Sequence, residues 1–86
     1  MQAIWKFPLS IQSAAQQVDM PRGAKILLVH EQHGRPTIWA EVNENSALET
    51  RTFFIVATGE RFSGFHPYIG TAFCGDFVWH VLEVNL

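Results

Sequence analysis

Cysteine and charge are both scarce in this 86-residue chain. Cys74 is the one cysteine, so neither an intrachain disulfide nor a zinc site with four thiolate ligands can form. A lone cysteine fits a reducing compartment, and we expect a cytoplasmic protein. Charged residues make up 16% of the sequence, below the usual share of about 25%.

The few basic residues are scattered along the chain, and the net charge is −2. Binding to a long nucleic acid neutralises several phosphates along a basic patch, so we do not expect that partner. A small anionic ligand needs far fewer cations and stays open. No apolar run approaches the roughly 18 residues of a membrane-spanning helix, and the first residues do not resemble a signal peptide. We therefore expect no membrane partner.

Hydrophobic residues, by contrast, form 48% of the sequence. A chain this short forms one domain, 1–86, and buries only about 60 to 65% of the surface of its unfolded chain. The sequence therefore carries more apolar side chain than a monomer of this size can hide. We expect a homo-oligomer.

The stretch 51–59 predicts a strand that is covered on both faces. Aromatic and β-branched residues occur on both of its sides: Phe53, Ile55 and Ala57 on one, Phe54, Val56 and Thr58 on the other. A helix is disfavoured, because the run is short and these side chains lose rotamer freedom in a helix. The rest of the chain must supply the two layers that cover this strand.

Further strands are predicted over 3–7, 24–31, 37–42, 65–74 and 77–84. In the second of these, Ile26 and Leu28 are expected on one face and Leu27 and Val29 on the other. The segment 10–17 is ambiguous, because its apolar spacing permits a short helical turn behind Ser10. We favour a turn followed by a short strand over 16–20.

Three turns are predicted between these strands. Met20 to Gly23 suits a type I turn, His33-Gly34 suits a hairpin, and Gly75-Asp76 suits a type II′ hairpin. The sum is an all-β, mostly antiparallel domain of six or seven short strands. A small sandwich or a curled sheet both fit this pattern.

Five short motifs occur in order along the chain. They are Ile-Trp-Lys-Phe-Pro-Leu over 4–9, Met-Pro-x-Gly-Ala-Lys-Ile-Leu over 20–27, Ile-Trp-Ala over 38–40, Thr-Gly over 58–59 and Tyr-Ile-Gly-Thr over 68–71. Over nearly the whole chain this pattern resembles a family of small uncharacterised bacteriophage proteins, a domain of unknown function. The resemblance supplies no catalytic residues.

A bacteriophage context suggests one class of function by analogy. Small oligomeric phage proteins sequester the nucleotide signals of bacterial immunity, as the anti-CBASS and anti-Thoeris sponges do. We therefore expect a non-enzymatic protein that binds a nucleotide-derived signal in the host cytoplasm. The alternative is a structural or protein–protein interaction module that binds a host or virion protein. An enzyme ranks third, because no paired acid and base groups are evident.

Six residues form the candidate ligand-binding set, chosen for aromatic stacking, for phosphate binding, or for their place in or after the loop over 59–64. They are Trp39, Arg51, Arg61, Phe62, His66 and Tyr68. An aromatic ring stacks on a base, and a guanidinium binds a phosphate through two hydrogen bonds. Trp39 shares its strand face with Thr37 and Glu41, which indicates an exposed or half-exposed side chain.

Each candidate also has a purely structural interpretation. The aromatic residues can pack in a core or a dimer interface, and the arginines can be solvated charges at strand ends. The pair His30 and His33 does not suit a metal on extended backbone, where the two side chains point to opposite faces. Cys74 beside His66 or His80 lacks an activating cation. We expect no metal, no cofactor and no catalytic residue.

Overall fold

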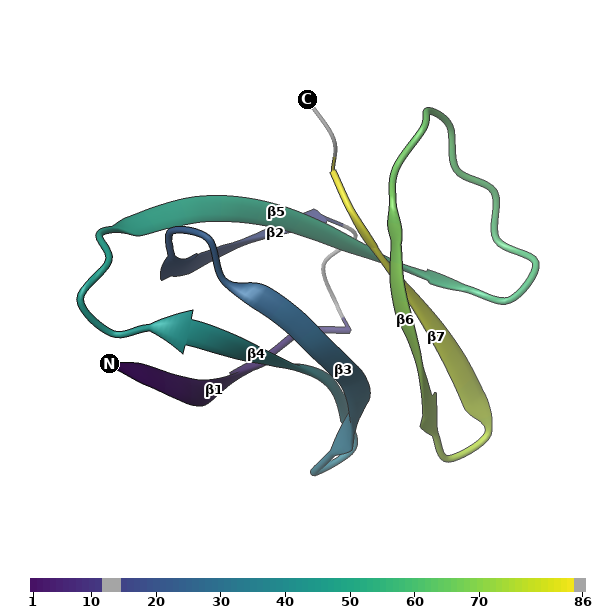
Figure 1. The fold of residues 1–86 in the computed structure, drawn as a ribbon. Coiled ribbons are helices and arrows are strands. Elements are labelled where there is room, and N and C mark those ends of the chain that lie inside the picture. Colours follow the sequence, from purple (N-terminus) through teal and green to yellow (C-terminus); the bar gives the residue numbers. More distant parts are fainter. Residues whose placement is uncertain (12–14, 85–86) are drawn as a thin grey trace.

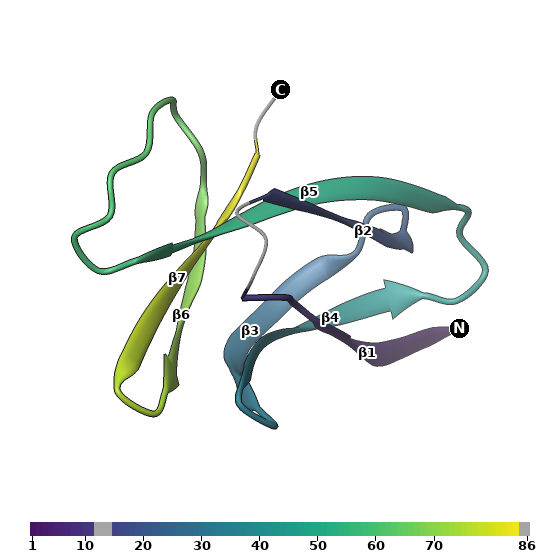
Figure 2. The ribbon, with the colours of Figure 1, turned by 180° about the vertical axis from the view of Figure 1, so that it is seen from behind.

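The computed structural model describes residues 1–11 and 15–84, and within them seven strands form two sheets packed face to face (Figures 1 and 2). The strands are β1 (Gln2–Pro8), β2 (Ala15–Pro21), β3 (Lys25–Gln32), β4 (Arg35–Asn43), β5 (Leu48–Ala57), β6 (Tyr68–Cys74) and β7 (Phe77–Glu83). The strand order is β1-β4-β3 in one sheet and β2-β5-β7-β6 in the other. Every pairing is antiparallel, so the all-β prediction is confirmed.

The ambiguous segment is extended where the structure describes it. Residues 15–17 belong to β2, which begins one residue before the predicted strand and runs to Pro21. Residues 12–14, where a helical turn was considered, lie outside the described residues. Within the described ranges, no helix is long and apolar enough to span a membrane.

The core lies between the two sheets and is built by strand alternation. β4 contributes Ile38, Ala40 and Val42, which pair across the sheet with the inward-facing residues of β1. β5 contributes Phe53 and Ile55, also buried. Successive side chains in a strand point to opposite faces. The face of each sheet that looks toward the other sheet is therefore apolar and buried, while the outer face is partly exposed to solvent.

β5 has neighbours on both edges and apolar residues on both faces, as predicted. It pairs with β2 on one side and β7 on the other, and Figure 1 shows it running above β3 and β4. Its outer residue Val56 is buried as well, although it points away from the core. A segment that does not belong to either sheet must therefore cover Val56 on this outer face.

β3 departs from the predicted alternation. Ile26 pairs with Ala40 and Leu28 pairs with Trp39, so a β-bulge at Leu27 shifts the register by one residue. Ile26 consequently packs on the core, whereas Leu28 lies on the outer face with Trp39. The prediction that Ile26 and Leu28 share a face is wrong, because a bulge reverses every side chain that follows it.

The hairpin turns follow the sequence closely. His33 and Gly34 have φ of 54° and 78°, which is the pattern of a type I′ hairpin, and Gly75 has φ of 61° at the first position of the last hairpin. The predicted type I turn at Met20 is wrong. Ala24 donates to the carbonyl of Pro21, and Gly23 at the third position has φ of 81°, as a type II turn requires.

The two sheets approach most closely where β6 crosses β3. A Cβ atom placed on Gly70 would lie 2.8 Å from the Cβ of Val29. Glycine at this position lets the side chain of Val29 pack directly against the backbone of β6. Position 70 is therefore a packing constraint of the sandwich.

Candidate ligand-binding site

A cavity lies on the outer face of β5, β7 and β6, beneath the loop that joins β5 to β6 (residues 58–67). Because β5 and β6 run in the same direction on either side of β7, this loop leads from beside Trp79, at the end of β5, back to beside Leu82, at the start of β6. Figure 1 shows the loop projecting beyond the sheet before it returns as β6. Sheet surface and loop together line the cavity, which is open to solvent on one side.

The loop is held down by contacts between aromatic rings. Phe54, on the outer face of β5, contacts Phe62 with ring centroids 5.6 Å apart and His66 with centroids 5.1 Å apart, both in edge-to-face geometry. Such ring pairs stabilise by about 0.5–1.5 kcal/mol beyond their burial. Phe62 is thus folded back onto the sheet and remains half-exposed.

Two local features, a pair of hydrogen bonds at its start and a glycine near its end, set the shape of the loop. At its start, the backbone N–H of Ala57 donates to Glu60 Oε1 at 2.9 Å, and Glu60 N–H donates to the carbonyl of Ala57 at 3.0 Å. Near its end, Gly64 has φ of 93°, and a Cβ atom there would lie 2.8 Å from His66 Nε2. Glycine is required at 64 on both counts.

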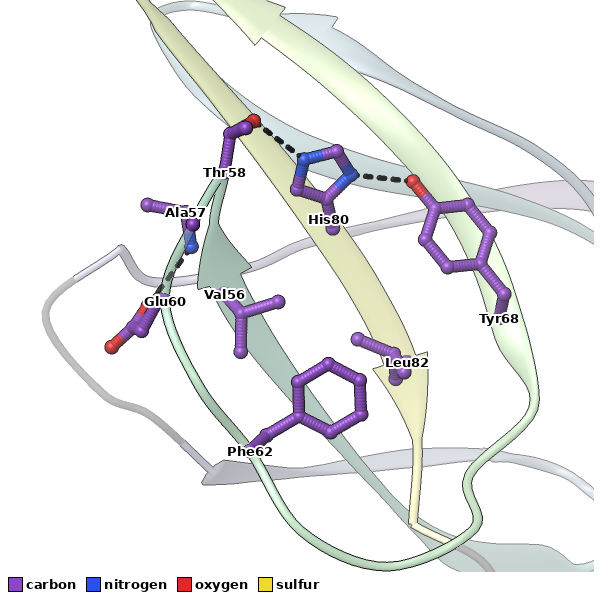
Figure 3. A pocket seen from close by; sticks show the side chains of 9 residues that line it. Val56, Ala57, Thr58, Glu60, Phe62, Tyr68, His80 and Leu82 are labelled. Carbon is purple, nitrogen blue, oxygen red and sulfur yellow. Dashed lines mark hydrogen bonds between the residues drawn. The ribbon is translucent and has the colours of Figure 1, made fainter.

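The cavity has a volume of about 190 Å³ and an apolar lining with polar groups along one side. Val56 and Leu82, both buried, contribute apolar walls along with the ring of Phe62 (Figure 3). The remaining lining residues are Ala57, Thr58, Gly59, Glu60, Tyr68 and His80. Figure 3 shows Glu60 on the side of Ala57, across the cavity from Tyr68.

A chain of hydrogen bonds joins four side chains on this face. His80 Nε2 lies 2.8 Å from Thr58 Oγ1, and His80 Nδ1 lies 2.7 Å from the hydroxyl of Tyr68. The Tyr68 hydroxyl also bonds Thr71 Oγ1. In a neutral imidazole one nitrogen donates and the other accepts, while each hydroxyl does either. All three hydrogen bonds can therefore form whichever way the protons are donated along the chain from Thr58 to Thr71.

The structure brings two of the predicted residues to the cavity, Phe62 and Tyr68, and places His66 and Arg61 in the same loop. Trp39 is half-buried, as predicted, but lies on the other sheet, next to Lys6 and Leu28. It is therefore separate from the cavity.

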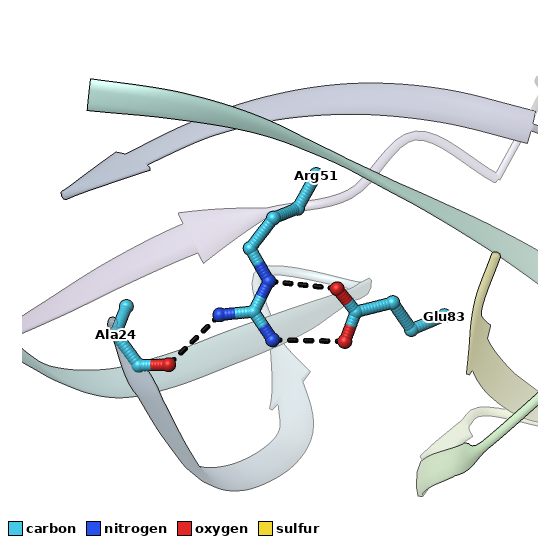
Figure 4. A network of polar contacts seen from close by, with 3 residues as sticks. All are labelled: Ala24, Arg51 and Glu83. Carbon is cyan, nitrogen blue, oxygen red and sulfur yellow. Dashed lines mark hydrogen bonds and ion pairs between the residues drawn. The ribbon is translucent and has the colours of Figure 1, made fainter. Parts of the chain in front are cut away.

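Arg51 lies on the inner side of the fold and binds protein groups instead of facing the cavity (Figure 4). Its Nε and Nη2 donate to the two carboxylate oxygens of Glu83 at 2.7 and 2.8 Å, and Nη1 donates to the carbonyl of Ala24 at 2.8 Å. The hydrogen bond to Glu83 raises the pKa of Arg51, although burial opposes it. Each of its three nitrogens is engaged, so Arg51 joins β5, β7 and the start of β3.

Two residues central to the site were not in the candidate set, Thr58 and His80. Both ring nitrogens of His80 are hydrogen-bonded. Its alternation with Val78 and Leu82 places it on the outer face of β7. Its partners are Thr58, just after β5, and Tyr68, at the start of β6, and only the strand order brings those two strands to either side of it.

The other groups considered for chemistry lie apart from this site. Cys74 is buried on the core side of β6, and burial, with a smaller effect of the charge on Glu31, raises the pKa of its thiol. His80 is on the opposite face of the sheet. In the described part of the chain, no three His, Cys, Asp or Glu side chains come together as a metal site would need.

The comparison with protein families gives one match. The model of a domain of unknown function, DUF7352, matches residues 1–86. No curated protein and no solved structure matches the chain. The match carries no information on a ligand or an activity, so function must be argued from the site.

Proposed function

The chain belongs to the DUF7352 family, and we propose that it is a non-enzymatic binding protein that sequesters a small nucleotide-derived signal. The observation that carries this proposal is the cavity beneath the 58–67 loop, with apolar walls and the Thr58–His80–Tyr68 chain along one side. Small-molecule sites are typically apolar hollows with a few convergent polar groups. The ring of a ligand would enter the cavity.

Arg61 supplies the cation that a phosphate would need. It is exposed, sits next to Phe62 in the loop, and makes no ion pair with any residue that the structure describes. A guanidinium suits two-point binding of a phosphate. The anionic part of the ligand would therefore lie outside the cavity, against the loop.

The size of the cavity favours a site that a second copy completes. Its volume of about 190 Å³ is below the roughly 300–1,000 Å³ of drug-sized sites. Large apolar side chains stay exposed near it, with Phe65 97% and Phe73 71% exposed. A homo-oligomer that covers these residues would also enclose the outer part of the ligand. With the resemblance to bacteriophage proteins, this supports an anti-defence sponge in the host cytoplasm.

The same exposed aromatics support the alternative, a module that binds a host or virion protein. Phe65 and Phe73 would then contact that protein, and the cavity would hold one of its side chains. The two functions differ in what stabilises the purified protein. A nucleotide stabilises only the sponge.

The test is a thermal-shift screen against linear and cyclic nucleotides and ADP-ribose derivatives. A ligand that binds the native state at a thousandfold excess over Kd stabilises it by about 4 kcal/mol, which is many degrees for a domain of this size. Tyr68→Phe should weaken the effect, whereas Trp39→Phe, on the other sheet, should not. Recovery of the ligand unchanged supports binding without turnover. A flat response to the whole panel would overturn the proposal.

A further inference from the structure

The dimensions of the cavity bear on which part of a ligand enters it. A dry cavity of about 150 Å³ in another protein takes up benzene. The present cavity, at about 190 Å³, therefore has room for one six-membered ring with small substituents. Two fused rings need more room than one. Size alone favours a monocyclic ring over a purine.

The walls suit a flat ring. Val56 and Leu82 present aliphatic groups from neighbouring strands, and they are paired near one another, since Val56 pairs with His80 and Phe54 with Leu82. Phe62 is fixed by its edge contact with Phe54, so one aromatic ring is already oriented at the cavity before a ligand arrives. A planar ligand loses little freedom on entering such a site.

The polar edge of the ring would meet the hydrogen-bond chain. In one direction Thr58 donates to His80 Nε2, Nδ1 donates to Tyr68, and Thr58 retains a lone pair that accepts from a ligand. In the other direction Tyr68 donates to Nδ1, Nε2 donates to Thr58, and the Thr58 hydroxyl is free to donate. One chain thus serves a ligand amino group and a ligand carbonyl equally.

Charge decides where the anionic part lies. The carboxylate of Glu60 is bonded to the backbone of Ala57 at the base of the loop, so the cavity wall carries a negative charge on that side. A phosphate inside the cavity would be repelled, whereas Arg61 lies outside it in the exposed part of the loop. The ring enters and the phosphate stays out.

We propose that the cavity binds the pyrimidine ring of a nucleotide, with carbonyl-bearing and amino-bearing rings accepted alike through reversal of the Thr58–His80–Tyr68 chain. This inference rests on the proposed function and sharpens it. It excludes purines as the buried group. It also assigns Thr58 as the residue that contacts the polar edge of the ring.

The experiment is calorimetric titration with uridine, cytidine, adenosine and guanosine monophosphates, followed by the same titrations on variants. Uridine and cytidine monophosphates should bind at least about tenfold more tightly than the purine nucleotides, and within about threefold of each other, because one hydrogen bond of either direction has a similar net strength. Thr58→Val removes the hydroxyl at nearly constant shape and should weaken both by about tenfold. Thr58→Ser should retain binding.

Thr50→Val is the matched control. Thr50 lies on β5, the strand that ends just before Thr58, is exposed, and donates to Asp19 at 2.7 Å, far from the cavity. Its substitution should leave all four affinities unchanged. If the two valine variants behave alike, the inference is overturned, since Thr58 then has no special contact.

The remaining outcomes separate this inference from the proposed function. Purine nucleotides that bind as tightly as pyrimidine nucleotides overturn the inference and leave the proposed function standing. So does binding of another member of the wider nucleotide panel without any binding of pyrimidines. A preference for only one of the two pyrimidines overturns the reversal of the chain. Failure of the whole panel overturns the proposed function itself.

Discussion

The guanidinium of Arg51 and the carboxylate of Glu83 form a two-point ion pair between the neighbouring strands β5 and β7. Both side chains are about four-fifths buried, and Arg51 also holds the carbonyl of Ala24. We expect Arg51→Lys to lower the free energy of unfolding by about 2 kcal/mol, because an ammonium retains the charge but not the planar fork. Urea denaturation measures the change.

Arg22→Lys is the control for this prediction. Arg22 lies 3.9 Å from Glu49, and its side chain is 74% exposed, so solvent screens the pair. We expect a change below about 0.5 kcal/mol. Equal losses for Arg22→Lys and Arg51→Lys would contradict the structural role of Arg51.

Gly70→Ala tests the close approach of β6 to β3. The added methyl group would meet Val29 at 2.8 Å, so one backbone has to move, and overpacking of this kind costs about 1–3 kcal/mol. Gly34→Asn is its counterpart, since nothing lies within 4 Å of that position and asparagine tolerates its positive φ. Thermal unfolding should distinguish the two. A neutral Gly70→Ala would show that the sheets are more loosely packed there.

The thiol of Cys74 should react slowly in the folded protein. Burial raises its pKa and hides it from solvent, so little thiolate is present at pH 8. Because the pKa is higher in the folded state, this neutral thiol contributes stability at neutral pH that is lost as the pH rises through the raised pKa. Labelling with a chromogenic disulfide should be at least about tenfold faster in urea. Equally fast labelling of the native protein would contradict burial.

Self-association follows from the apolar side chains that the fold leaves exposed. On the large sheet Phe73 is 71% exposed, and on the small sheet Leu28 is 53% exposed. We expect an oligomer at micromolar concentration in sedimentation velocity. Phe73→Glu should dissociate it if the face that carries the cavity forms the interface, and Leu28→Glu should do so if the other sheet does. A monomeric wild-type protein would count against both interfaces.

The local pattern of the sequence carried much of the fold. Alternation identified β5 as a strand with two apolar faces, and the His33-Gly34 pair identified a hairpin whose positive φ angles are observed. The half-exposed environment of Trp39 also followed from its neighbours. These are short-range properties, set by side chains a few residues apart.

The site depended on relationships of longer range. Thr58, Tyr68 and His80 are 10 to 22 residues apart and meet because β7 is inserted between β5 and β6. Nothing in the pattern of either strand specifies that order. The bulge at Leu27 was missed for a related reason, since an extra residue in β3 is defined only by its pairing with β4.

The insertion of β7 has a consequence for how the domain assembles. During synthesis, β5 and β6 leave the ribosome before the strand that must join them. Without it β5 lacks a hydrogen-bonding neighbour on one edge, and β6 lacks its neighbour in the sheet altogether. Folding of the larger sheet then waits for the C-terminal strand, and pairing of such distant segments is slow. Until that strand arrives these unpaired edges are open to pairing with other chains. The insertion of β7 would then both complete the ligand-binding cavity and remove the strand edges that can aggregate.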